Sequence, residues 1–366
     1  MTFREVSFDL CLDSPAFLGG ALGQAEWRVP PIKALLRQMW RIAVAPELQG
    51  YDHAELAQRE ADYFGAAAGG NGRRSEVVLR FESAWGSGSL AHWPRRPPTV
   101  YHPEVMSGSK ISSDLYLGYG PLTTTARGTD LKEGRSALDP GEDRVAVRLR
   151  YREDLEQGLR LPEVLTLVNL FGTLGGRSRN GWGSVRLEAV RQLDLGDAPQ
   201  RLTDREKVGD WLRRHGFVRP WEECLRLSWT HAVGEDERGL LIWRTKEQRE
   251  SWQKVMGDLA QAKIGVRTQF HFRGGRQHPD VCERHVLAYP VTNHEVGAWP
   301  RDFRMPNQLR FKVVRESNDD YRGYIFHLPW RPPPDDRDND RVNLALATRV
   351  WRQVHQTLDR LCERWG

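Results

Sequence analysis

The chain has 366 residues, 39% of them hydrophobic and 28% charged, a composition typical of a folded globular protein and not of a disordered one. No apolar run approaches the ~18 residues of a membrane span. Glu5, Asp9 and Asp13 interrupt the N-terminal stretch that a signal peptide would keep apolar, so we expect a cytoplasmic protein with no membrane partner. The formal net charge of +5 is too small to identify a polyanionic ligand, and only clustering of the cations would do so.

The first half of the chain predicts strands and helices around one long insertion. Residues 3–12 alternate apolar and polar side chains, as a half-buried strand does. A helix opens at Pro30-Pro31 and stops at Pro46. Further elements are predicted as a helix over 54–64, strands at 75–82, 144–151 and 184–191, and a helix from Pro162 to about Phe171. Residues 83–142 are rich in Gly, Pro, Ser and Thr and indicate an insertion, so the main elements follow the βαββαβ order of the ferredoxin-like fold, which RRM-type RNA binders share.

The second half is less regular but fits a similar pattern. We predict strands at 225–233, 284–290, 308–315 and 321–328, an amphipathic helix near 245–261, a loop over 331–341 and a closing helix. The closing helix carries one apolar stripe, formed by Val350, Trp351, Val354, Leu358 and Leu361. The expected fold class is α+β with two ferredoxin-like (RRM-like) domains. Residues 1–195 would hold the insertion and a glycine-rich loop, and residues 196–366 a degenerate second copy.

One row of cations follows the helix that starts at Pro30. Lys33, Arg37 and Arg41 recur at four-residue spacing, which places them on one side of the helix, and no acid lies within the helix to neutralise them. A phosphate backbone is the natural partner of such a row. The alternative interpretation is an ordinary solvated helix face.

A glycine- and arginine-rich segment, Gly175–Gly183, lies between the helix ending near Phe171 and the last strand of the first half. Its glycines, among them Gly175 and Gly176, would let backbone N–H groups approach a ligand. Arg177 and Arg179 would add donors that match phosphate, and Trp182 a face for stacking. The alternatives are a helix cap with a tight turn, or a nucleotide loop, which we discount because no Gly-Lys-Ser/Thr follows and the next element is a strand.

Other candidate chemistry has less support in the sequence. His278, Cys282 and His285, with His271 upstream, could contribute to a zinc site, but the four scattered cysteines form no CxxC pair, so we favour a polar loop without a cofactor. Ribonuclease chemistry could use polar side chains of the insertion, although none has an identifiable partner. These side chains are His92, His102, Asp114 and Asp130.

These segments, in this order, resemble the Cmr branch of the RAMP superfamily of CRISPR proteins, and within it subunit one of the type III-B effector complex. The stretch SPAFLGGALGQAEWRVPPIKALLRQMWRIAV, which includes Arg28, is similar to that family's N-terminal motif. EADYFG with SEVVLRF resembles its second strand region, and LVNLFGTLGGRSRNGWGSVRL its glycine-rich loop. RHVLAYPV and NQLRFKVV resemble C-terminal segments more weakly. The chain departs from the family at Ala34, Gln38 and Asn180, where glycine, an aromatic residue and a basic residue are common.

The resemblance implies a non-catalytic subunit that contacts guide RNA near its 3′ end, helps to capture target RNA and lies beside other RAMP subunits. The implied RNA-binding residues are Arg28, Lys33, Arg37, Arg41, Gly175, Gly176, Arg177, Arg179 and Trp182. Two alternatives stay open: a RAMP endoribonuclease that processes guide RNA or cleaves target RNA through the insertion, and a purely structural assembly protein whose aromatic side chains dock other subunits.

Overall fold

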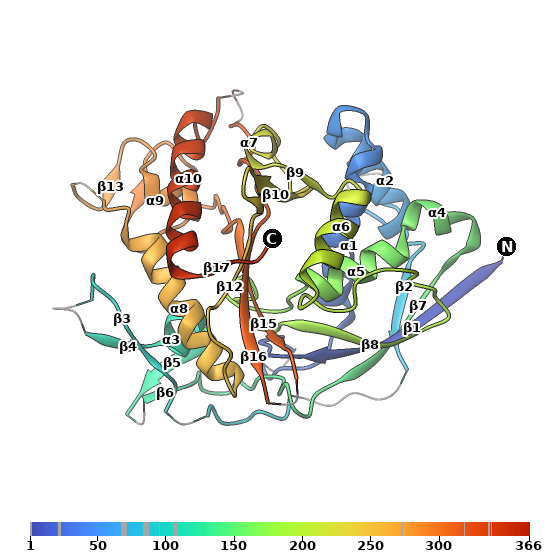
Figure 1. Ribbon diagram of the computed structural model, residues 1–366, viewed down its shortest axis with the longest axis horizontal. Helices are drawn as coiled ribbons and strands as arrows, with labels where there is room; N and C mark the ends of the chain where they lie inside the picture. The colour runs from blue at the N-terminus through green and yellow to red at the C-terminus, as the bar shows by residue number, and fades with distance from the viewer. Residues whose placement is uncertain are drawn as a thin grey trace.

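The computed structural model describes residues 2–20, 23–66, 72–82, 88–94, 96–105, 109–126, 128–272, 274–317, 319–335, 337 and 339–366. It is a mixed α+β structure with two four-stranded antiparallel sheets and several smaller sheets (Figure 1). Within the described residues, no helix is long and apolar enough to cross a membrane.

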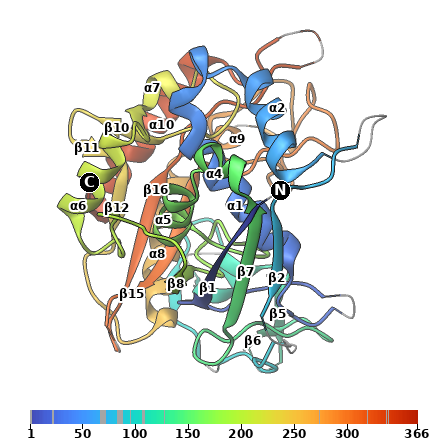
Figure 2. The same ribbon diagram turned by 90° about the vertical axis from the view of Figure 1, so that its right-hand side faces the viewer.

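The first sheet has the strand order β2-β7-β1-β8, with every neighbouring pair antiparallel, and Figure 2 shows these strands in succession. Its strands are β1 (Phe3–Leu12), β2 (Val78–Phe81), β7 (Val145–Arg152) and β8 (Val185–Arg191). The helices α1 (Val29–Val44), α2 (His53–Phe64) and α5 (Leu161–Phe171) belong to the same half. The predicted order of strands and helices is therefore confirmed here. Successive side chains of a strand point to opposite faces of its sheet. In β7, every second residue is therefore on the core side, and these residues are Val145, Val147, Leu149 and Tyr151, all buried.

The second sheet has the order β15-β16-β12-β17, again with antiparallel neighbours. Its elements along the chain are β12 (Ile242–Arg244), α8 (Trp252–Thr268), β15 (Leu309–Arg315), β16 (Tyr321–His327), α10 (Leu344–Leu361) and β17 (Glu363–Arg364). These six elements repeat the strand-helix-strand-strand-helix-strand order of the first half, with much shorter first and last strands.

Both faces of the second sheet are covered. Phe311 and Ile325 point toward α8 and α10, whereas Phe326 points toward α5, where its ring centroid lies 4.9 Å from that of Phe171. On the same side as Phe326, Lys312 donates hydrogen bonds to the carbonyls of Asn169 and Val185, both at 2.7 Å. The predicted boundary between residues 195 and 196 stays a prediction, and side chains from both sides of it share one core.

The insertion forms its own small elements and lies beside α8, at the lower left of Figure 1. They are β3 (Thr99–Tyr101), β4 (Lys110–Ser112), α3 (Ser113–Gly118), β5 (Leu122–Thr125) and β6 (Gly128–Leu131). Trp93, Leu117 and Leu122 of the insertion join the buried cluster around α8. The insertion therefore packs against α8 and shares its buried cluster. Residues 83–87, 95, 106–108 and 127, which the prediction also included, lie outside the described residues.

The other helices are α4 (Glu156–Leu159), α6 (Arg205–Arg214), α7 (Trp221–Cys224) and α9 (Glu283–Leu287), with 3-10 turns at Ala45–Glu47, Gln49–Tyr51 and Glu153–Leu155. The other strands are β9 (Val218–Pro220), β10 (Val233–Asp236), β11 (Gly239–Leu240), β13 (Gln277–His278) and β14 (Glu295–Val296).

Three predictions for the second half need correction. The strand predicted at 225–233 is a turn region, and β10 begins only at Val233. The segment predicted as a strand at 284–290 is mostly the helix α9. The prediction failed because a short apolar run has no periodicity that distinguishes a helix from a strand. The helix predicted near 245–261 begins at Trp252 and ends at Thr268, since Ser251 caps it by accepting a hydrogen bond from the Lys254 amide.

Candidate nucleic-acid interface

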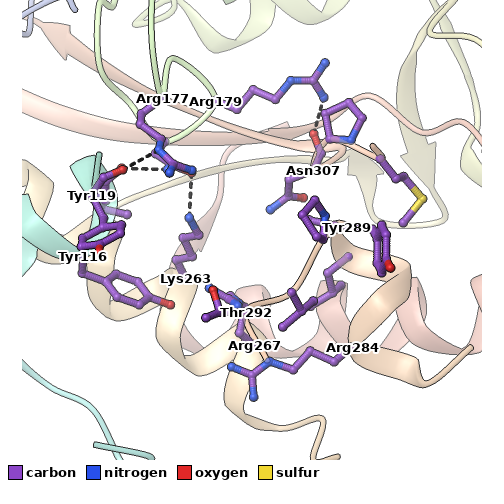
Figure 3. Close-up of a pocket in the computed structure, with 18 of the residues that line it drawn as sticks. Tyr116, Tyr119, Arg177, Arg179, Lys263, Arg267, Arg284, Tyr289, Thr292 and Asn307 are labelled. Atoms are coloured by element: carbon purple, nitrogen blue, oxygen red, sulfur yellow. Dashed lines mark hydrogen bonds between the residues drawn. The ribbon is translucent and has the colours of Figure 1, made fainter. Parts of the chain in front are cut away.

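A cavity of about 640 Å³ lies where the glycine-arginine segment, the insertion and the second half of the chain meet (Figure 3). Five cationic side chains line it: Arg177, Arg179, Lys263, Arg267 and Arg284. No Asp or Glu is among the described residues that line it. Of the five cations, Arg284 is engaged with an acid, because its two terminal nitrogens donate to Glu104 at 2.6 and 2.8 Å. The cavity is therefore a strongly electropositive site that favours an anionic ligand.

Two residues of the glycine-arginine segment fix the wall that the insertion provides. The Nε of Arg177 donates to the carbonyl of Tyr119 at 2.8 Å, and the side-chain amide of Asn180 donates to the carbonyl of Leu117 at 2.8 Å. Both carbonyls lie at the C-terminal end of α3, where a helix leaves its last acceptors unpaired. The segment thus satisfies that end of α3 and holds Tyr119 at the cavity.

Lys263 is the cation at the centre of this network. Its ammonium donates to the side-chain oxygen of Asn180 at 2.7 Å, and no ion pair is formed by it within the described residues. Burial, together with the positive charges of Arg267 and Arg177, lowers the pKa of Lys263 from 10.5 to about 7. Asn180 is one of the departures from the family pattern, and here a neutral side chain bridges Lys263 and α3 where a basic residue would repel the ammonium.

Arg179 connects the cavity to β15. Its Nη1 donates to the carbonyl of Asn307 at 2.5 Å, its own carbonyl accepts from the Phe311 amide, and burial lowers its pKa to about 10. Burial of the neighbouring Arg310, with a smaller contribution from the positive charge of Arg179, lowers the pKa of Arg310, and its Nη1 donates to the side-chain oxygen of Gln38 on α1 at 2.7 Å. Arg310 therefore links β15 to α1 at Gln38, which is not one of the three cations of the predicted row.

The cation row on α1 is partly neutralised from outside the helix. Arg37 and Arg41 both bind the carboxylate of Glu60 on α2, and two of the hydrogen bonds, one from each Nε, are 2.6 Å long. The Glu60 side chain is only 6% exposed, and although burial raises its pKa, the two guanidinium groups outweigh burial and hold it below its ordinary value. Lys33 alone of the three forms no ion pair within the described residues. Arg28 donates to the Gly19 carbonyl at 2.7 Å, and none of these four cations lines the cavity.

Trp182 does not offer a stacking face, and this prediction is wrong. The ring is completely buried among Phe17, Trp93 and Trp252, with ring centroids 5.3 to 5.9 Å apart. An indole gains more from this aromatic cluster than from contact with water. The residue supports the cavity wall from within.

The glycines that precede it also serve the chain itself. The amide of Gly176 donates to the Phe17 carbonyl at 2.8 Å, so it is not free for a phosphate. A Cβ on Gly175 would lie 2.8 Å from the same carbonyl oxygen, which shows that its small size allows two backbone segments to meet. The expectation of a ligand contact from the Gly176 amide is therefore wrong, because that amide is bonded to the N-terminal segment, whereas the expectation for Gly175 stays a prediction.

The candidate catalytic residues of the insertion do not form a constellation. Asp114 is fully buried and accepts from the Trp93 indole and Gln253 at 2.9 and 3.0 Å, and burial raises its pKa to about 6. Asp130 accepts from two backbone amides, and His92 is exposed. The Nδ1 of His102 accepts from the Glu104 amide at 3.2 Å, which leaves the proton of the neutral ring on Nε2. In this tautomer the free nitrogen is a donor and not a base.

His278, Cys282 and His285 do come together, joined by His294. The Nε2 of His278 lies 2.9 Å from the Nδ1 of His294, and the Sγ of Cys282 lies 3.4 Å from the Nδ1 of His278. His285 instead accepts the Cys282 amide at 3.0 Å, so these side chains hydrogen-bond to one another and do not converge on one point. Among the described residues, no group of three or more His, Cys, Asp or Glu side chains is arranged to hold a metal ion.

The sequence identified two of the five cavity cations, Arg177 and Arg179. It missed Lys263, Arg267 and Arg284 because they belong to the second half of the chain. The four-residue spacing of Lys263 and Arg267 was a signal, since it places both on one side of α8. The predicted helix ended near residue 261 and so excluded both.

Comparison with known proteins gives likeness in structure only. No model of a protein family and no curated protein matches the chain. The chain is similar over 96% of its length to 97% of the crystal structure of Cmr1 from Pyrococcus furiosus (apo form), with 16% identity and a TM-score of 0.45. It is similar over 98% of its length to 99% of a chain in the cryo-EM structure of the Type III-B Cmr-beta bound to cognate target RNA, with 11% identity and a TM-score of 0.48. A chain of a Type IV-B CRISPR complex matches 54% of this chain and 95% of its own, with 16% identity and a TM-score of 0.32. Two of these structures carry the Cmr name, the branch that the sequence motifs resemble.

Proposed function

We propose that this protein is a non-catalytic RNA-binding subunit of a type III CRISPR RNA-guided effector complex. It would contact guide RNA near its 3′ end, help to capture target RNA in antiviral defence and lie beside other RAMP subunits in the cytoplasm. The observation that carries the RNA-binding part is the cavity with five cations and no lining carboxylate among the described residues. The motif resemblance and the two sheets, which we infer to be two ferredoxin-like units, support the assignment to the complex.

The chemistry of the cavity suits a sugar-phosphate backbone. Arginine guanidinium groups bind phosphate oxygens through paired donors, and an ammonium adds a point charge. These contacts read the charge and the shape of the backbone and carry little sequence information. A guide-dependent complex needs such contacts, because base pairing supplies its sequence specificity.

The test of RNA binding is a salt titration with the purified full-length protein and a fluorescent single-stranded RNA. Replacing Arg267 with glutamine should weaken binding and reduce the slope of log affinity against log salt by about 0.7, the contribution of one phosphate contact to a single strand. Arg226→Gln is the matched control, since Arg226 is exposed and does not line the cavity. An Arg267→Gln protein with the wild-type slope would refute the site.

The proposal that the subunit is not an enzyme rests on the occupied hydrogen bonds of Asp114 and on the tautomer of His102. Labelled RNA incubated with the protein, with and without a divalent metal ion, should stay intact. Turnover that His102→Ala or Asp114→Ala abolishes would establish the endoribonuclease alternative in its place. His53→Ala is a suitable control because His53 is exposed, lies on α2 outside the insertion and does not line the cavity.

A further inference from the structure

Tyr119 is an exposed aromatic residue on the edge of the cationic cavity. It is 68% exposed, the most of the large hydrophobic side chains that stand out on the described surface, and it is one of the residues that line the cavity. Tyr101, on β3, is exposed to a similar extent, at 53%, but does not line the cavity. Because most of the Tyr119 side chain is exposed, it contributes little to the packing of the core. It lies beside the cations that line the cavity.

The turn that carries Tyr119 is held firmly from two sides. The Nε of Arg177 binds its carbonyl oxygen at 2.8 Å, and the next residue, Gly120, has a φ of +114°, which a residue with a side chain rarely adopts. On the other side, a Cβ on Gly118 would lie 3.2 Å from the indole nitrogen of Trp182. The buried indole therefore fixes the end of α3 from below, while the tyrosine ring projects outward.

This arrangement combines the two parts of a site for single-stranded nucleic acid. Such sites pair a cationic track for the backbone with an aromatic face on which a base stacks. In a duplex the faces of the bases are already stacked on each other and unavailable, whereas a single strand can place one base on a tyrosine. Arg177 joins both parts, because its Nε binds the tyrosine turn and the residue also lines the cavity.

We propose that Tyr119 is a stacking platform for one base of a single RNA strand whose adjoining phosphates lie in the cationic cavity. This inference rests on the proposed RNA-binding function and adds the state of the ligand, a single strand with an unpaired base at this position. Tyr119 takes the role that the sequence assigned to Trp182. Every base has an aromatic face that can stack on a tyrosine ring, so this contact would not depend on the RNA sequence.

The test compares two labelled strands of equal length, an oligouridine RNA and a ribose-phosphate strand without bases, on the purified full-length protein. Tyr119→Ala should weaken binding of the oligouridine by about 5- to 150-fold, the range for loss of one base stack, and leave the abasic strand nearly unchanged. Tyr119→Phe should restore most of the affinity, because it keeps the ring. Tyr101→Ala, the matched exposed tyrosine, should behave as the wild type.

The salt slope distinguishes stacking from charge. Tyr119→Ala should leave the slope unchanged, because no phosphate contact is lost. If the wild-type protein binds neither strand, the proposed function itself fails. If it binds both strands and Tyr119→Ala weakens neither, or weakens both equally, the function stands and the platform is refuted. Unchanged RNA binding with lost association to other RAMP subunits would also overturn it, and would assign Tyr119 to a protein contact.

Discussion

Replacing Lys263 with methionine should remove a pH dependence of RNA binding that the wild-type protein shows above about pH 7. Burial and the nearby Arg267 and Arg177 lower the pKa of Lys263 from 10.5 to about 7 in this structure. A pKa change of this size means that charging the amine there costs about 5 kcal/mol more than in water. A phosphate about 4 Å away would return about 4 kcal/mol of this at an effective dielectric constant of 20, so bound RNA should raise the pKa again.

The direction of the effect follows from these two pKa values. Below pH 7, Lys263 is charged in the free and in the bound protein, so affinity should not change with pH. Above pH 7, the free protein has lost the proton that the bound protein keeps, so binding takes up a proton and affinity should fall by up to about tenfold per pH unit. The fall ends when the pH passes the higher pKa of the complex.

The assay is fluorescence anisotropy at constant ionic strength from pH 6 to about pH 9, because salt alone would change the affinity. Lys263→Met should bind more weakly than wild type at pH 6 and show a flat profile above pH 7. Lys254→Met is the matched control, an exposed lysine on the same helix α8 and outside the cavity. A wild-type affinity that is flat or rises above pH 7, or a Lys263→Met profile as steep as that of the wild type, would refute this reasoning.

Two further predictions concern the side chains whose expected roles the structure changed. Lys33→Ala should reduce the slope of log RNA affinity against log salt by about 0.7 without loss of stability. Arg41→Ala should instead lower the free energy of unfolding in urea by about 1–3 kcal/mol, because the buried Glu60 loses a charged partner. The native pKa of Glu60 lies below 4.5, so the stability difference between wild type and Arg41→Ala should be complete above pH 4.5. It should shrink as the pH falls through the native pKa of Glu60. A stability difference that persists in stronger acid would contradict the ion pair. Trp182→Ala should lower the free energy of unfolding by about 3–5 kcal/mol, with Trp182→Phe intermediate, because it empties a closed aromatic cluster. Unchanged urea stability together with lost RNA binding would instead indicate that the indole contacts the ligand.

Local patterns were enough to predict most of the first half. The alternation in β1 and β7, and the proline pair that opens α1, depend on residues close in sequence, and these elements form as expected. The strands β15 and β16 were also predicted: Leu309, Phe311 and Val313 alternate with polar residues in β15, and β16 contains the short apolar run Tyr324–Phe326. Short elements such as β12 and β17 depend on pairing with distant strands, so no local pattern marks them.

The site was less predictable because its residues meet only in three dimensions. The cation row on α1 looked unneutralised because Glu60 lies on the next helix. Trp182 looked exposed because glycines surround it in sequence, although its ring contacts come from the insertion and α8. Lys263 shares one side of a helix with Arg267, and Arg284 begins the segment RHVLAYPV, but neither pattern shows that these cations lie beside Arg177 in the folded chain.

Arg310 and Lys312, two of the three cations on β15, make the proposed recognition site depend on both halves of the polypeptide. Lys312 links the second sheet to the end of α5 and the start of β8, and Arg310 links it to α1, so the two halves meet through buried polar contacts as well as apolar ones. A charged amine buried in this way would be left without acceptors if the halves separated only slightly. We therefore expect a fixed spacing between the walls of the cavity, so that a bound RNA strand would have to adapt its own backbone to fit.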